Sequence, residues 1–217
     1  MPFLTLPRLH DLVSGRSTLQ ELREVAIDDL LGRDPVSLDW KNISESLTGK
    51  VVLVSGGGGS IGSELCRQIA KVGPSSIVLL DQSEFNLYSI EIELSRVYPN
   101  LALHACLVNV ADSQAVDNVL SHSSPNVIFH AAAYKHVPML ESQARQAVSN
   151  NVLGTKTLAL AADKHGCGIF VMVSTDKAVN PANIMGASKR AAEIFCQSLA
   201  NRSKTRFITV RFGNVLD

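Results

Sequence analysis

The chain has 217 residues, 46% of them hydrophobic and 18% charged, and its 20 basic side chains balance 20 acidic ones. This length is enough for one well-buried core and a small appendage, and a net charge of zero argues against a nucleic-acid partner or an anionic membrane surface. Within these residues we expect no membrane-spanning segment and no secretory leader, because no apolar run is long enough. The four scattered cysteines indicate reduced thiols of a cytoplasmic protein, with no metal site.

Residues 1–47 are predicted to form an N-terminal arm or linker, because they hold too little apolar sequence for a core of their own. A capping-box pattern that starts at Ser17 predicts a short helix to about Val25, and a second short helix is expected over residues 28–36. A disordered extension is the alternative. Residues 48–217 are predicted to form the main domain.

From Gly49 onward, short apolar runs alternate with helical patterns. Strands are expected over residues 51–55, 77–81, 101–107, 126–130, 168–174 and 206–211, and helices over 60–72, 85–97, 112–120, 141–165 and 183–200. Apolar strands separated by helices predict an α/β fold, a doubly wound parallel sheet that is covered on both faces. Ligands of such sheets lie beyond the carboxyl ends of the strands.

The first strand runs into a glycine-rich turn and then into a helix. Gly56 would allow the tight exit from the strand, Gly59 would let a pyrophosphate approach the backbone, and Gly62 would let the helix pack closely. Ser60 and Ile61 would present the free N–H groups of the helix N-terminus to the phosphates. A flexible loop is the alternative for a glycine run by itself, but strand, turn and helix together predict a Rossmann dinucleotide site.

Residues after the next two strands would complete the adenosine side of this site. Asp81 ends its strand about 20 residues past the turn, where a carboxylate can bind the ribose hydroxyls, and Gln82 and Ser83 are counted with it. Because residues 82–86 include no Lys or Arg for a 2′-phosphate, NAD is favoured, with NADP as the alternative. Asn109 and Val110 could contact the adenine or form an ordinary loop.

Two further strand ends carry small and polar residues. After residues 126–130, the small Ala131, Ala132 and Ala133 would let the cofactor pass, and a polar cluster at the mouth of the cleft follows, made of Tyr134, Lys135 and His136.

After residues 168–174 come Thr175, Asp176 and Lys177, then Met185 and Lys189 on the next helix. This group offers a proton donor and an acceptor beside the nicotinamide; an N-cap with a surface ion pair is the alternative.

These motifs resemble the extended short-chain dehydrogenase/reductase superfamily. Within it, the chain looks like the bacterial nucleoside-diphosphate-sugar 4,6-dehydratases of polysaccharide biosynthesis, in the membrane-associated UDP-N-acetylglucosamine 4,6-dehydratase branch. The resemblance covers nearly the whole chain, and the segments that carry it are residues 29–36, 56–66, 81–86, 130–138, 151–155, 174–181 and 211–215.

The resemblance implies a lyase that uses bound NAD(P) to make a sugar for capsule or lipopolysaccharide. Carbon 4 of a UDP-sugar would be oxidised, water lost across carbons 5 and 6, and the hydride returned to carbon 6. The matching positions imply Asp176 as general acid, Lys177 as general base and Thr175 as a hydrogen bond to the carbon-4 oxygen. Lys189 could reach the nicotinamide ribose. A 4-epimerase or reductase, or an NAD-binding module without catalysis, is the alternative.

Met185 departs from the superfamily pattern, because it stands where the Tyr-x-x-x-Lys motif has its catalytic tyrosine. A thioether cannot act as a base, which leaves the oxidation base open among Asp176, Lys177 and a water molecule. The large members of this branch share the methionine, so it need not mean inactivity.

The resemblance also implies that the chain is a fragment, truncated at both ends. The family's catalytic domain continues beyond Asn214, itself an expected substrate contact along with the polar cluster 134–136. The substrate subdomain would thus be largely missing, and the fragment could bind NAD without turnover. The larger members carry transmembrane helices, so full-length relatives would lie at the cytoplasmic face of the inner membrane, and we expect a homo-oligomer.

Overall fold

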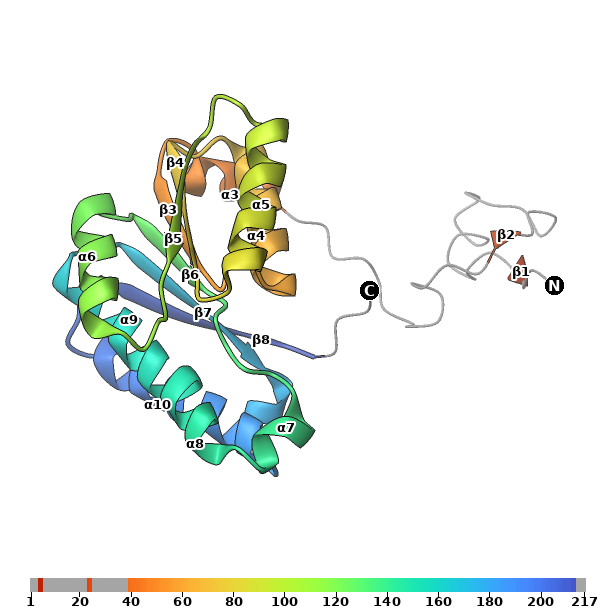
Figure 1. The fold of residues 1–217 in the computed structure, drawn as a ribbon, viewed down its shortest axis with the longest axis vertical. Coiled ribbons are helices and arrows are strands. Elements are labelled where there is room, and N and C mark those ends of the chain that lie inside the picture. The colour runs from red at the N-terminus through yellow and green to blue at the C-terminus, as the bar shows by residue number, and fades with distance from the viewer. Residues whose placement is uncertain (1–3, 6–22, 25–38, 214–217) are drawn as a thin grey trace. The chain divides into compact units, whose positions relative to one another are not determined.

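The computed structural model describes residues 4–5, 23–24 and 39–213 (Figure 1), and the chain divides into two units, residues 1–40 and 41–217. In the first unit, β1 (Leu4–Thr5) pairs antiparallel with β2 (Arg23–Glu24). The helix expected up to Val25 is therefore wrong at Arg23–Glu24, and the remainder of both expected arm helices lies outside the described residues.

The second unit is built on a six-stranded parallel sheet in the order β5-β4-β3-β6-β7-β8. Its strands are β3 (Val51–Ser55), β4 (Ser76–Asp81), β5 (Ala102–Leu107), β6 (Val127–His130), β7 (Ile169–Thr175) and β8 (Arg206–Phe212). The chain moves outward from β3 to β5 and then returns to the other side of β3 with β6. This reversal beside β3 is the point at which doubly wound sheets bind their ligands.

Helices cover both faces of the sheet (Figure 1). One face packs against α3 (Trp40–Leu47), α4 (Ser60–Val72) and α5 (Glu84–Val97), and the other against α6 (Ser113–Ser123), α9 (Gly154–Lys164) and α10 (Ile184–Ala200). Alternation along β3 divides its side chains between the two cores: Val52 and Val54 enter the first, and Leu53 enters the second. These findings confirm the predicted α/β fold and its doubly wound sheet.

The helix expected over residues 141–165 is continuous from Ala144 to Lys164, but its beginning is wrong, because residues 142–143 separate it from α7 (Val137–Glu141). The continuous part consists of α8 (Ala144–Ala147), a π-helix (Val148–Leu153) and α9. The wider π turn brings Asn150 and Asn151 to the buried side, and π turns often occur at functional sites. No helix among residues 39–213 combines the length and apolar character that crossing a bilayer would need.

Helix α3 begins at the last residue of the first unit, Trp40, and the rest of it belongs to the second unit, where Leu47 is buried in the same core as Ile69 and Leu87. The expected end of the arm at residue 47 stays a prediction, and so does the assignment of the arm as a linker.

Candidate active site

Close backbone contacts shape the glycine turn between β3 and α4. Gly56 has a φ of 68°, and a Cβ there would lie 2.6 Å from the backbone nitrogen of Ala132. A Cβ at Gly62 would overlap the carbonyl oxygen of Gly56. A Cβ at Gly59 would meet only that same oxygen, at a tight 3.3 Å, and no other atom within 4 Å. The turn thus leaves one backbone position at which a ligand can approach closely.

Helix α4 begins at this open position without a side-chain cap. Gly59 is its N-cap residue, and Ser60, Ile61 and Gly62 of its first turn line the adjoining cavity. Uncapped N–H groups and the positive end of the helix dipole favour an anion there. A pyrophosphate therefore fits the turn.

Asp81 at the end of β4 joins the expected adenosine side of the site to the turn. Its Oδ2 accepts the N–H of Gly58 at 3.0 Å, and its Oδ1 accepts the N–H of Ser83 at 2.9 Å. Each oxygen keeps a second lone pair for a ribose hydroxyl. Asp81, Gln82 and Ser83 line one cavity of about 210 Å³, and none of the described residues that line it is a lysine or arginine.

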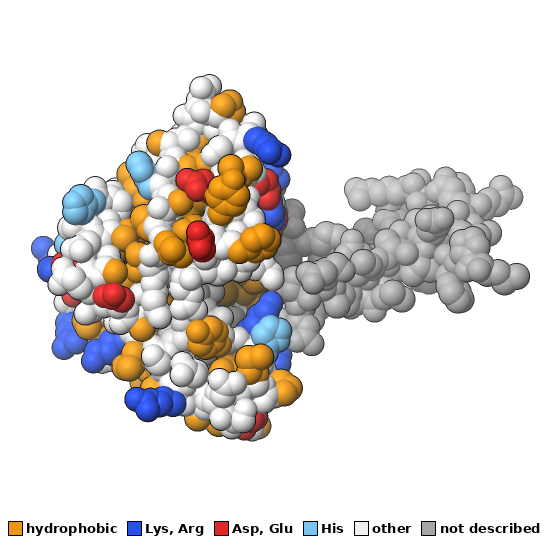
Figure 2. Space-filling model, viewed as in Figure 1, with side chains coloured by type: hydrophobic (Ala, Val, Ile, Leu, Met, Phe, Trp, Pro, Cys, Tyr) orange, Lys and Arg blue, Asp and Glu red, His pale blue; other side chains and the backbone are white. Residues whose placement is uncertain are grey.

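Three adjoining cavities together form one crevice beyond the carboxyl ends of the strands. Their volumes are about 210, 520 and 740 Å³, and Ala131, Ala133 and Tyr134 line all three. Lys135 lines the two larger ones and His136 the middle one. Figure 2 shows this side of the surface hollowed between the regions of α5 and α7, beside basic and histidine side chains.

The largest cavity gathers most of the candidate catalytic residues. Thr175, Lys177, Met185 and Lys189 line it, at the ends of β7 and α10. Asp176 does not line it; its exposed carboxylate accepts hydrogen bonds from Thr175 Oγ1 at 3.0 Å and from Lys177 Nζ at 3.2 Å. The hydrogen bond from Thr175 contributes most, and the one from Lys177 second, to holding the pKa of Asp176 below its ordinary value. The ionised carboxylate is therefore the favoured form.

Met185 and Lys189 occupy the buried wall of this cavity. The Met185 side chain packs with the buried side chains of Leu140 and Ala147. Lys189 is only 5% exposed, and burial lowers the pKa of its ammonium to about 8. A lysine in this state exchanges a proton near neutral pH.

A buried polar chain that sequence reasoning did not assign joins three elements below the crevice. His130 at the end of β6 is fully buried, between Ser55 Oγ at 2.7 Å and Thr155 Oγ1 at 2.8 Å. Burial is the main reason, and the nearby charge of Lys189 the second, that the pKa of His130 is lowered to about 3. Since Thr155 donates its hydroxyl to the Asn151 carbonyl, it accepts from His130 Nε2–H, and Ser55 donates to Nδ1. The neutral imidazole thereby ties the end of β3, where the glycine turn begins, to β6 and α9.

Asn151 of the π-helix holds the loop after β6 in the same way. Its Oδ1 accepts the Tyr134 N–H at 2.8 Å, and its Nδ2 donates to the Tyr134 carbonyl at 3.0 Å and to Ser188 Oγ at 3.0 Å. Asn150 lines the adenosine-side cavity. The sequence signal for both was an Asn-Asn pair inside a predicted helix, where asparagine is unfavourable.

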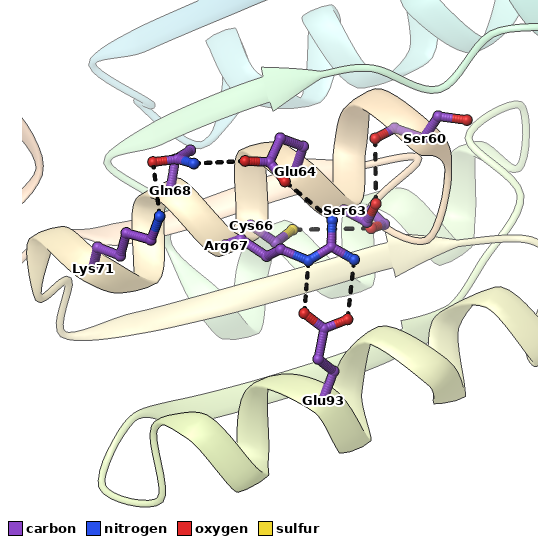
Figure 3. A network of polar contacts seen from close by, with 9 residues as sticks. Ser60, Ser63, Glu64, Cys66, Arg67, Gln68, Lys71 and Glu93 are labelled. Atoms are coloured by element: carbon purple, nitrogen blue, oxygen red, sulfur yellow. Dashed lines mark hydrogen bonds and ion pairs between the residues drawn. The ribbon is translucent and has the colours of Figure 1, made fainter. Parts of the chain in front are cut away.

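Two further charged side chains line the outer part of the largest cavity. Arg67 of α4 donates to both carboxylate oxygens of Glu93 on α5, at 2.6 and 3.0 Å, and to Glu64 at 3.1 Å (Figure 3). Glu64 and Arg67 both line the cavity. Sequence reasoning did not assign them, because the partner of Arg67 lies on a different helix.

A buried ion-pair cluster supports the strand ends behind the catalytic residues. The side chain of Glu193 is fully buried and accepts hydrogen bonds from Arg211, Arg190 and Ser174. Burial alone would raise the pKa of Glu193, but the bonds from Arg211, Ser174 and Arg190 outweigh burial and lower the pKa to about 2.

We expect Glu193→Gln to lower the free energy of unfolding by about 2–3 kcal/mol, since hydrogen bonds to a charged group are worth about that much. Because the folded pKa lies below the ordinary value of 4.5, this stabilisation is complete above pH 4.5 and is lost as the pH falls towards 2. Urea unfolding at several pH values would measure it. An equal loss at pH 7 and at the acid end of this range would contradict the assignment.

The structure does not bring every predicted site residue to the crevice. The side chain of Asn109 accepts the N–H of Ala111 within its own loop, and its neighbours Val108 and Val110 line the cavity instead. Asp176 lies outside the cavity lining, and Asn214 lies outside the described residues. The contribution of the remaining residues to binding or catalysis stays a prediction.

Most of the chain matches one known protein family. The family model described as polysaccharide biosynthesis protein matches residues 52–217. The chain belongs to this family. It is thereby a relative of the extended short-chain dehydrogenase/reductases, as the resemblance implied.

Individual members of the family and its relatives are similar to the chain over most of its length. Capsular polysaccharide biosynthesis protein CapD of Staphylococcus aureus is 48% identical over 213 residues, which are 97% of this chain and 36% of CapD. UDP-N-acetylglucosamine 4,6-dehydratase (inverting) of Campylobacter jejuni is 28% identical over 172 residues, 77% of this chain and 50% of that enzyme. The chain thus spans about a third of CapD and half of the dehydratase.

A solved structure gives the same picture of the fold. The X-ray structure of Pen from Bacillus thuringiensis matches with a TM-score of 0.72 and 29% identity, over 78% of this chain and 54% of that one. The described sheet and helices therefore correspond to about half of a larger folded chain of this kind.

Proposed function

We propose that the chain is the cofactor-binding part of an NAD-dependent nucleoside-diphosphate-sugar 4,6-dehydratase that acts on UDP-N-acetylglucosamine or a similar UDP-sugar in polysaccharide synthesis. The observation that carries the proposal is the largest cavity. It unites a hydroxyl and an ammonium of the Thr175–Lys177 segment with the buried Lys189, directly beside the glycine turn.

The residues of the crevice fit a dinucleotide. Gly59 and the first turn of α4 would hold the pyrophosphate, and Asp81 would bind the adenosine ribose. Lys189 would hold the nicotinamide ribose at the far end. The lack of a lysine or arginine among the described residues of the adenosine-side cavity supports NAD over NADP. When bound, the nicotinamide would take a hydride from carbon 4 of the sugar and return it to carbon 6.

The chain's own residues would move the protons. Thr175 would donate a hydrogen bond to the carbon-4 oxygen. Hydrogen bonds from Thr175 and Lys177 hold the pKa of Asp176 low, so its carboxylate is ionised and carries no proton to donate. We therefore assign Asp176 as the acceptor of the carbon-5 proton, and the Lys177 ammonium as the donor to the leaving carbon-6 hydroxyl. This reverses the two roles that the resemblance implies.

The proposal is tested by product formation in heavy water. This chain, and a version extended to the full catalytic domain, would be incubated with UDP-N-acetylglucosamine and NAD, and deuterium in the sugar nucleotide followed by mass spectrometry. We expect a 4-keto-6-deoxy product with deuterium at carbon 5 from the extended version. A 4-epimer without deuterium at carbon 5 would indicate an epimerase, and bound NAD without product from either version would overturn the dehydratase proposal.

A further inference from the structure

One hydrogen bond joins the two sides of the crevice. Gln82 Nε2 donates to Tyr134 Oη at 3.1 Å, between residues 52 positions apart in the chain. Gln82 follows β4 and Tyr134 follows β6, and β3 lies between these two strands in the sheet. Neighbouring strands are about 4.8 Å apart, so the two side chains together bridge about 10 Å of the sheet edge. The bridge crosses the end of β3, where the glycine turn begins.

Both partners line the same adenosine-side cavity as the turn. Gly56 and Gly59 form part of its wall, together with Gln82 and Tyr134. The bonded side chains are exposed, Tyr134 by 39%, so the bridge lies at the mouth of the cavity. A dinucleotide whose pyrophosphate lies at Gly59 would therefore pass between the turn and the bridge.

The backbone at each end of the bridge is held from beneath. Asn151 binds both the N–H and the carbonyl of Tyr134. On the other side, Asp81 precedes Gln82 and accepts the N–H of Ser83, which follows it, and also the N–H of Gly58 in the glycine turn. Because the two backbones are fixed by buried groups, the contact between the side chains costs little further ordering. Opening the bridge needs only side-chain rotation.

We propose that Gln82 and Tyr134 form a clasp that closes over the bound dinucleotide and slows its release. The inference rests on the proposed function, because it takes the cofactor to lie in this crevice. It also moves Tyr134 from the expected substrate contacts to the cofactor side. In the proposed reaction the cofactor is restored in every cycle, so slow release keeps the protein loaded between substrates.

The test is a double-mutant cycle on cofactor release. The chain and its variants Gln82→Ala, Tyr134→Phe and the double variant are loaded with NADH and diluted into excess NAD⁺, and the loss of bound nicotinamide fluorescence gives the release rate. We expect each single variant to release NADH about threefold to tenfold faster, the ratio that corresponds to one net hydrogen bond. The double variant should release it no faster than the faster single variant, because both changes remove the same bond.

Matched changes elsewhere serve as controls. Gln114→Ala removes a similar exposed bond to Asn118 on α6, and Tyr88→Phe removes a hydroxyl from an exposed tyrosine on α5; neither residue lines the crevice, and release should be unchanged. The melting temperature of the unloaded variants should also stay unchanged, which a merely structural role would not allow. Additive effects, or release at the original rate, would overturn the clasp alone. Failure of the unaltered chain to bind NADH would overturn the clasp together with the proposed cofactor site.

Discussion

Gly62→Ala should prevent the cofactor turn from folding and abolish NAD binding. An added Cβ would overlap the carbonyl oxygen of Gly56 and lie 2.7 Å from its carbonyl carbon. Both are backbone atoms, so relief requires α4 to move away from the turn. We expect a loss of about 3 kcal/mol or more in the free energy of unfolding, at the upper end of the usual cost of overpacking. Urea unfolding and titration with NAD would measure the two effects.

Gly59→Ala is the matched control, because it adds the same methyl group three residues earlier. There the Cβ meets only one atom, at 3.3 Å, and the φ of −73° suits alanine. We expect stability to change by less than about 1 kcal/mol, while NAD binding weakens by about 100-fold or more, since the methyl group lies where the pyrophosphate would approach. Unchanged NAD affinity in this variant would place the pyrophosphate elsewhere.

Local chemistry explains why most of the fold could be predicted from the sequence. A helix was expected from residue 112, and the carboxylate of Asp112 caps α6 by accepting the N–H groups of Gln114 and Ala115. A helix was expected from residue 183, and Asn183 caps α10 through Gly186. Strand ends, caps and the glycine turn depend on residues that are close in sequence, so their pattern is sufficient.

The parts that could not be predicted depend on contacts between distant residues. Helical periodicity continues across residues 141–165, and no local signal marks the π turn that brings Asn151 to Tyr134. The same limit applies to the candidate site. The segment Thr175–Lys177 was correctly located at the end of β7, but its spacing could not show that Asp176 binds its two neighbours outside the cavity lining.

Asp176 and Lys177 are in contact, and either of them could donate the proton to the carbon-6 oxygen. In the version extended to the full catalytic domain, we expect Asp176→Asn and Lys177→Met each to lower turnover of UDP-N-acetylglucosamine by about 100-fold to 10,000-fold, the usual contribution of a general acid or base. A sugar nucleotide with fluorine in place of the carbon-6 hydroxyl separates the two roles, because fluoride can leave without being protonated.

On the fluorinated substrate, Lys177→Met should regain most of its lost turnover, whereas Asp176→Asn should stay slow because removal of the carbon-5 proton still needs a base. Asp117→Asn and Lys164→Met are the controls: these residues form another exposed ion pair, at 2.7 Å, between α6 and α9, and neither change should affect either substrate. If the fluorinated substrate restores Asp176→Asn instead, Asp176 is the acid and the roles implied by the family resemblance hold. Restoration of neither variant would exclude both side chains as the donor, and would direct attention to Thr175 and Lys189, which line the same cavity.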